Sequence, residues 1–181
     1  GYYMHVFRQM NTYKRNKFNF SAFLFSGGWL LYRKQYKPGI ILTALVLALY
    51  IGSMLLSYFV VSPIMLEAID AAGISYSDIS YFQFTEVLAQ YLMDRPTEYL
   101  IFCSPLLCYG LILVIMIVVG IRGNKMYMNH CIRTIQGIKR TCTNENDSEI
   151  AYTNRGGVNT AVVFCLLDCY FITRWNPMFF L

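Results

Sequence analysis

The chain has 181 residues, of which 56% are apolar and only 14% are charged, and its formal net charge is +5. This composition is too apolar for an ordinary soluble domain and predicts an integral membrane protein. Basic residues of a membrane protein usually mark its cytoplasmic side, so we do not interpret the positive charge as a nucleic-acid surface.

The N-terminal segment, residues 1–38, contains a short apolar block with basic residues on both sides. Phe18–Tyr32 would be about 22 Å long as a helix, against a hydrocarbon core of about 30 Å. Positive charge at both ends places both ends on the cytoplasmic face. We call the block together with its basic flank, residues 18–37, the N-terminal block. It is predicted to form a re-entrant or interfacial helical segment, and Gly27-Gly28 is its expected bend.

Three apolar runs follow as candidate transmembrane helices. Residues 39–61 form a run of 23 residues without a charge, and residues 100–121 form a run of 22. Residues 157–173 are a weaker third candidate, because the run has 17 residues and contains Asp168. We therefore expect an all-α integral membrane protein with about three transmembrane helices and a short tail, 174–181.

The segments between these runs differ in charge. Residues 1–38 carry seven Lys and Arg and residues 122–156 carry six, whereas residues 62–99 are acidic and contain one basic residue, Arg95. Because cytoplasmic segments are enriched in Lys and Arg, this order predicts a multi-pass protein with a cytoplasmic N-terminus and an extracytoplasmic 62–99 segment.

The two longer connecting segments predict surface helices. In the acidic segment we expect two short amphipathic helices, one starting at Ser62-Pro63 and one at Ser77 or Asp78. Residues 124–140 predict a basic amphipathic helix at the lipid headgroups. The polar stretch 141–156 is expected to be a loop.

Asp168 is the strongest candidate for a functional residue. An acid near the middle of a span costs about 2.5–3.5 kcal/mol on insertion scales, so it should face protein or water. It is a candidate for a proton or cation pathway. We favour a protonated or hydrogen-bonded structural acid, because the predicted spans contain no second charge that would complete a relay.

A second candidate region is an interface for anionic lipid or a partner protein. Its expected residues are aromatic or basic and lie at the end of the N-terminal block and on the 124–140 helix. They are Trp29, Tyr32, Arg33, Lys34, Tyr36, Arg133, Lys139 and Arg140.

The chain shows no signature of catalysis or metal binding. It contains six cysteines without a Cys-x-x-Cys pair, and its histidines are His5 and His130. We therefore expect free thiols, no metal site and no cofactor. Phosphate-binding, nucleophile-elbow and His-Glu-x-x-His motifs are also missing, so we expect no catalytic residues and no enzymatic activity.

Residues 19–36, NFSAFLFSGGWLLYRKQY, resemble the signature of the DUF2628 family of small bacterial membrane proteins. The block 123–135 is similar to a later family segment with Gly-Asn, Tyr and His, and Gly156-Gly157 fits a third element. The chain departs from the family pattern in its acidic 62–99 segment and at Val158-Asn159. The matching residues of the first block are Ala22, Phe23, Phe25, Gly27, Trp29, Leu31, Tyr32, Arg33, Lys34, Tyr36 and Gly39.

The resemblance implies a location in the bacterial cytoplasmic (inner) membrane and no assigned activity. Our leading hypothesis is a non-enzymatic accessory or structural subunit that packs against a larger bacterial membrane complex, with membrane lipids and an integral membrane protein as partners. One alternative is a small transporter or channel that uses Asp168 in a homo-oligomer. Another alternative is an anionic-lipid-binding membrane protein.

Overall fold

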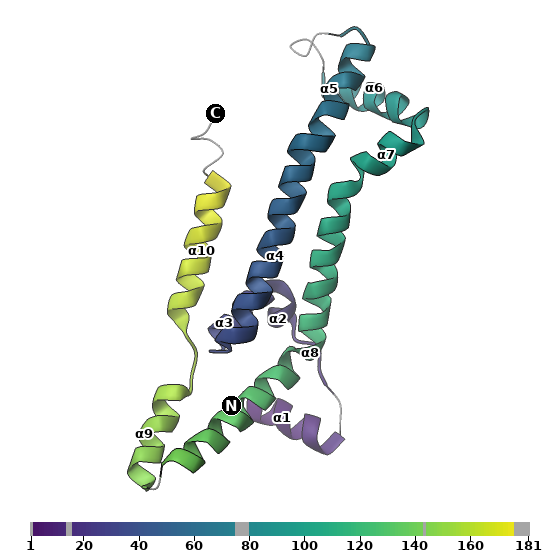
Figure 1. The fold of residues 1–181 in the computed structure, drawn as a ribbon. Coiled ribbons are helices and arrows are strands. Elements are labelled where there is room, and N and C mark those ends of the chain that lie inside the picture. The colour runs from purple at the N-terminus through teal and green to yellow at the C-terminus, as the bar shows by residue number, and fades with distance from the viewer. Residues whose placement is uncertain (1, 14–15, 75–79, 143, 176–181) are drawn as a thin grey trace. The chain divides into compact units, whose positions relative to one another are not determined.

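The computed structural model describes residues 2–13, 16–74, 80–142 and 144–175, and all regular elements within these ranges are helices (Figure 1). The all-α fold expected from the sequence is confirmed. The helices form two compact units. The first unit comprises Gly1–Ala44 and Val114–Leu181, and the second comprises residues 45–113.

Among the residues that the structure describes, two helices are long and apolar enough to cross a membrane. One is Tyr36–Ala71, which runs through α4 (Tyr36–Leu56), the π-helical segment η1 (Ser57–Val61) and α5 (Ser62–Ala71). The other is α8 (Ser104–Thr141). Only 11% and 17% of their most apolar windows are buried within the protein, whereas the core helix of a soluble protein is mostly buried.

The structure thus shows one spanning helix fewer than the roughly three that we expected. The third candidate, residues 157–173, forms α10 (Thr160–Trp175), which has 16 residues. A helix of that length is about 24 Å long, shorter than a typical hydrocarbon core of about 30 Å.

In the first unit, the N-terminal block folds as two short helices. These are α2 (Phe20–Phe25) and α3 (Gly27–Tyr32), separated at Ser26, whose φ of 43° lies in the left-handed region. The break falls one residue before the predicted Gly27-Gly28 bend. Asn19 starts α2 as its N-cap, since its side chain accepts a hydrogen bond of 3.0 Å from the backbone N–H of Ala22.

This pair of helices packs closely against α8. Ala22 and Trp29 belong to a buried cluster with Leu30 and Val119. A Cβ atom added to Gly123 would lie 2.9 Å from the Cβ of Ala22 and 3.4 Å from Cζ3 of Trp29. Glycine at position 123 therefore allows the backbone of α8 to approach α2 and α3 more closely than any other residue would.

A similar close approach joins α3 to α4. A Cβ atom added to Gly27 would lie 2.7 Å from the backbone nitrogen of Thr43 and 3.0 Å from the carbonyl oxygen of Gly39. The glycine of the predicted bend therefore has a packing role at the start of α3. The conformational break itself is made by Ser26.

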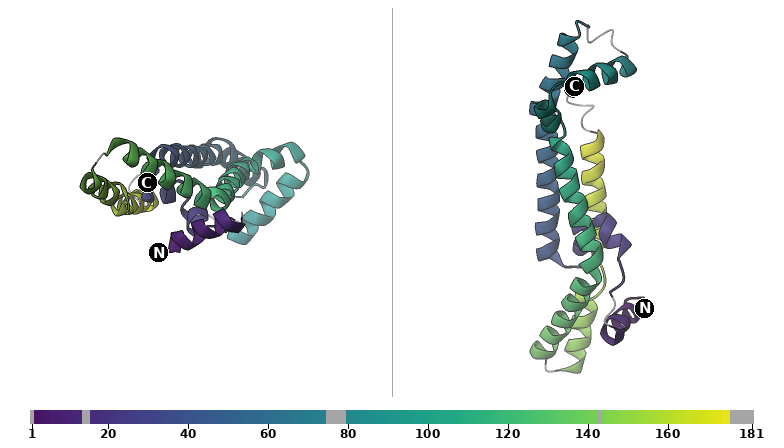
Figure 2. Two further views of the ribbon diagram at one scale, coloured as in Figure 1. Left: turned by 90° about the horizontal axis from the view of Figure 1, so that it is seen from below. Right: turned by 90° about the vertical axis from the view of Figure 1, so that its right-hand side faces the viewer.

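The C-terminal part of the first unit corrects two predictions. Residues 124–140 do not form a separate helix, because they continue α8 without a break. The predicted loop 141–156 is wrong, because Glu145–Arg155 forms α9, which folds back beside the last turns of α8 (Figure 2). Acidic residues in the first turn of α9 and Arg155 in its last turn complement the helix dipole.

In the second unit, the described residues of the acidic segment and its end form three short helices where we expected two. They are α5, α6 (Tyr81–Met93) and α7 (Pro96–Phe102). Ser80 starts α6 through a capping box with Gln83, whereas the predicted starts, Ser77 and Asp78, lie outside the described residues. The predicted span 100–121 also begins differently, since its first residues belong to α7 and α8 begins only at Ser104.

Replacing Gly123 by alanine should lower the melting temperature of the protein in detergent. The new methyl group would overlap the buried Ala22 and Trp29, and overpacking of this kind costs about 1–3 kcal/mol. Gly137→Ala is the matched control, because Gly137 lies in the same helix with nothing within 4 Å of the added Cβ. That control should be neutral or stabilising by about 0.5–1 kcal/mol, and equal melting temperatures for the two variants would contradict the close packing.

Candidate functional site

Two asparagines, the partly buried Asn19 and the buried Asn124, join the N-terminal block to α8. Nδ2 of Asn19 donates a hydrogen bond of 2.8 Å to Oδ1 of Asn124, and Nδ2 of Asn124 donates one of 2.8 Å to the carbonyl oxygen of Lys17. The backbone N–H of Asn19 also donates to the carbonyl oxygen of Gly120 at 2.9 Å. Because Asn124 is only 3% exposed, these bonds satisfy polar groups that water cannot reach and so fix the position of the block along α8.

Arg33, at the end of α3, lies among four aromatic rings. Its Cζ atom is 4.4 Å from the ring centroid of Tyr3, 5.1 Å from that of Tyr127, 5.3 Å from that of Tyr32 and 5.9 Å from that of Trp29. These rings belong to α1 (Tyr2–Tyr13), α3 and α8. Cation–π attraction acts over such distances, so the guanidinium group holds three helices together.

Lys34 ends α3 in a conformation that usually requires glycine. Its φ is 59°, its N–H donates to the carbonyl oxygen of Leu31 at 2.9 Å, and the N–H of Gln35 donates to that of Leu30 at 2.9 Å. This pair of bonds is a Schellman ending, and a non-glycine residue in its left-handed position costs about 1–2 kcal/mol.

The side chain of Lys34 supplies a reason for that cost. Its Nζ atom donates hydrogen bonds to the carbonyl oxygens of Asn154, at 3.2 Å, and Gly156, at 2.5 Å. Both carbonyls lie at the C-terminal end of α9, where a positive charge also interacts favourably with the helix dipole. Lys34 therefore caps a helix that is distant from it in sequence.

Asn159 completes the connection between α3 and the start of α10. Its backbone N–H donates to the carbonyl oxygen of Tyr32 at 2.9 Å, and its Nδ2 donates to the hydroxyl oxygen of Tyr36 at 3.0 Å. Three stretches that are far apart in sequence thus meet in the first unit. They are the N-terminal block, the segment of α8 around Asn124, and the linker between α9 and α10.

The DUF2628 family, described as a protein of unknown function, matches residues 5–133, which is more than half of the chain. This chain belongs to the DUF2628 family. Searches of curated proteins and of solved structures find no match. The match covers the N-terminal block and Asn124 and ends before α9, so the interactions of Lys34 and Asn159 reach beyond the family region.

The structure brings together five of the residues that we predicted for an interface in this DUF2628 chain. Trp29 is 4% exposed, and Arg33 lies against the rings of Trp29 and Tyr32. Lys34 donates to carbonyl oxygens at the end of α9, and the hydroxyl of Tyr36 accepts a hydrogen bond from Asn159 in the linker that follows α9. These side chains make internal contacts. The other three predicted residues lie exposed along the last turns of α8: Arg133, Lys139 and Arg140.

Asp168 lies on α10, where its side chain is exposed. Within the described ranges, the ion pairs are those of Arg95, so Asp168 has no charged partner there. The structure therefore does not join Asp168 to the cluster around Arg33 and Lys34.

We did not predict from the sequence several of the residues that connect the N-terminal block of this DUF2628 chain to α1, α8 and the start of α10. Asn19 and Asn124 carried a usable signal, because each is an asparagine beside a strongly apolar stretch and each lies in a block that resembles the family. Tyr3 carried no such signal, because we predicted no helix before the apolar block. Tyr127 and Asn159 were also missed.

The second unit has its own polar cluster around Arg95. Nη1 of Arg95 lies 3.7 Å from Glu67 and 3.6 Å from Glu98, and its Cζ lies 4.1 Å from the ring centroid of Tyr91. Desolvation, together with the carboxylates of Glu67 and Glu98, raises the pKa of Tyr91 to about 12. Arg95 thus contacts α5 through Glu67, α6 through Tyr91 and α7 through Glu98.

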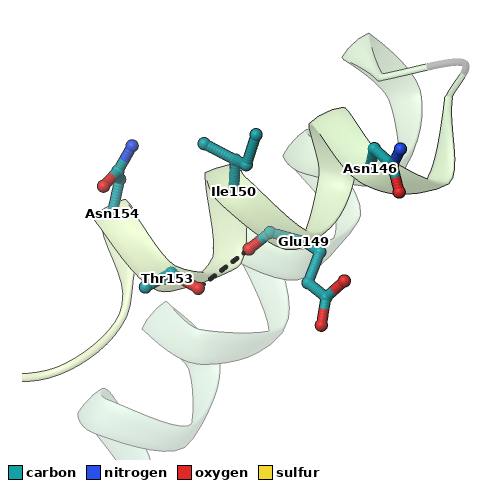
Figure 3. Close-up of a pocket in the computed structure, with 5 residues that line it drawn as sticks. All are labelled: Asn146, Glu149, Ile150, Thr153 and Asn154. Atoms are coloured by element: carbon teal, nitrogen blue, oxygen red, sulfur yellow. Dashed lines mark hydrogen bonds between the residues drawn. The ribbon is translucent and has the colours of Figure 1, made fainter.

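The structure also has a shallow polar depression on α9. Figure 3 shows that all of its lining residues come from this one helix, and the hydroxyl of Thr153 donates a hydrogen bond of 3.0 Å to the carbonyl oxygen of Glu149. A depression formed by one helix does not bring groups from several elements together, as an active site does. The lining residues are Asn146, Glu149, Ile150, Thr153 and Asn154.

Substitutions of Lys34 should separate backbone strain from side-chain capping. Lys34→Met keeps the strained conformation but loses both bonds to α9, so its melting temperature in detergent should fall. Lys34→Gly loses the same bonds but removes about 1–2 kcal/mol of strain, so it should melt close to the wild type. Lys37→Met is the control, since Lys37 is exposed near the start of α4. If Lys34→Met melted like Lys37→Met, the capping role would be wrong.

Proposed function

We propose that this protein is a non-enzymatic accessory or structural subunit of a larger complex in the bacterial inner membrane. The proposal rests on the contacts of three polar residues in the block 19–36. Asn19, Arg33 and Lys34 are all engaged with other parts of the same chain. Side chains that would serve binding or catalysis in an enzyme here stabilise a helical scaffold.

The exposed surface of the scaffold supports the same proposal. The two long helices leave many large apolar side chains uncovered, for example Ile41 at 68% exposure in α4 and Leu107 at 72% in α8. Lipid or a partner helix would cover such residues in a membrane. A subunit that offers apolar helix faces and a stable internal scaffold is suited to packing against another membrane protein.

We propose the topology from charge. The basic segments 1–38 and 122–156 would be cytoplasmic, and the acidic segment 62–99 would be extracytoplasmic. Both basic segments belong to the first unit and the acidic segment belongs to the second, which supports this assignment. α10 would then be a third, short membrane segment that enters the membrane from the cytoplasmic side.

Binding of anionic lipid is a second candidate, favoured by the exposed side of α8 near its end. Arg133, Lys139 and Arg140 are exposed there, and Ile132 and Ile135 are each 44% exposed. A helix surface that combines basic and apolar side chains fits the boundary between lipid headgroups and acyl chains.

Purification from native membranes in a mild detergent tests the accessory role. We expect a stoichiometric integral membrane partner, and we expect less of the assembled partner complex in cells that lack this protein. A protein that purifies alone under several mild conditions, with partner assembly unchanged in its absence, would rule the role out.

The charge-reversal variant Arg133→Glu/Arg140→Glu distinguishes the lipid candidate. It should reduce the anionic lipid retained in native mass spectrometry while leaving the partner bound. Unchanged lipid retention would count against the second candidate.

A further inference from the structure

α10 presents an acidic side chain on the exposed face of an apolar helix. Phe164 is 66% exposed and Leu167 is 44% exposed, and the exposed Asp168 lies four residues after Phe164. Residues spaced by three and four lie on one face of a helix, so the three side chains form one surface, the Asp168 face. α10 also contacts α3, which fixes the helix within the first unit.

Asp168 lies near the middle of this helix. It is eight residues from the first residue of α10 and seven from the last, or about 12 Å and about 10 Å along the axis. In our proposed topology it would therefore lie deep in the membrane, where an unpaired acid is unfavourable. The described part of the chain gives Asp168 neither an ion pair nor a hydrogen bond.

We propose that the Asp168 face docks against a transmembrane helix of a different protein that carries a Lys, Arg or His side chain at the depth of Asp168. This inference rests on the proposed accessory role and names the chemistry of its partner. Phe164 and Leu167 would pack against apolar side chains of that helix, and the carboxylate would pair with its cation.

The charge pattern of this chain argues against a second copy as the occupant. The apolar runs 39–61 and 100–121 contain no charged residue, so another copy has no cation to offer at that depth from its two long helices. Two α10 helices facing each other would place two carboxylates together, which is repulsive unless one of them binds a proton. A cation from another protein removes the cost of the buried acid and gives the contact its specificity.

The test compares Asp168→Asn with Asp147→Asn in the native complex. Asp168→Asn keeps the shape of the side chain but removes its charge, and Asp147 is an exposed acid on α9 in the same unit. We expect Asp168→Asn to lower the recovered partner at least about tenfold, because removing one member of a buried charge pair costs more than 1.4 kcal/mol, and the control to leave recovery unchanged.

A photo-crosslinking residue in place of Phe164, with Asp168 unchanged, tests the contact with the partner helix independently of how Asp168→Asn folds. We expect it to join a transmembrane segment of the partner that contains a basic residue. Exchanging the charges, with Asp168→Lys here and an acid at the partner's basic position, should restore recovery.

The outcomes separate the two proposals. If the wild type recovers no partner, the accessory role fails. If the wild type and Asp168→Asn recover the partner equally, the docking inference fails and the accessory role stands. Crosslinks from position 164 that join two copies of this chain would also overturn the inference, and they would favour the homo-oligomeric alternative.

Discussion

The close approach of the N-terminal block to α8 is the constraint on which the first unit depends. Gly123 leaves room for Ala22 and Trp29, and at that separation the side chains of Asn19 and Asn124 meet at 2.8 Å. A hydrogen bond contributes only about 0.5–1.5 kcal/mol net, but leaving the buried amide of Asn124 without its partner costs about 1–3 kcal/mol. Close packing and the amide pair therefore require each other, because shifting α2 along α8 would break both.

Once the block is fixed, the end of α3 is placed where its basic residues reach other helices. Arg33 lies among rings from three helices, and Lys34 reaches the end of α9. Ser26 and Lys34 both have positive φ, a conformation that persists in a non-glycine residue only when the surrounding structure holds it. The strain at Lys34 is offset by the two carbonyls that it caps, so the backbone conformation and the side-chain contact have one explanation.

The sequence predicted those features that depend on local pattern, and it failed where contacts are distant. Apolar runs indicated two long helices, and a small-residue pair indicated the break in the N-terminal block. The polar composition of α9 wrongly indicated a loop, because its stability depends on end charges and on capping by Lys34, which lies 120 residues from Asn154. The bond between Asn19 and Asn124 joins residues 105 apart, and no periodicity reports such a pair. The family resemblance marked the blocks that meet but did not show their contacts.

The DUF2628 match covers residues 5–133, so it includes the N-terminal block but not α10. The family match ends at residue 133, after the block and most of α8 that form the buried cluster around Trp29. α10 lies outside the match and holds an exposed acid that is unpaired in the described structure. In the accessory role that we propose, the internal contacts of Asn19, Arg33 and Lys34 make the first unit a support, and specificity for a partner would come from groups that these contacts leave free. In our proposal Asp168 is such a group, because a buried charge discriminates between partner helices more strongly than apolar packing does.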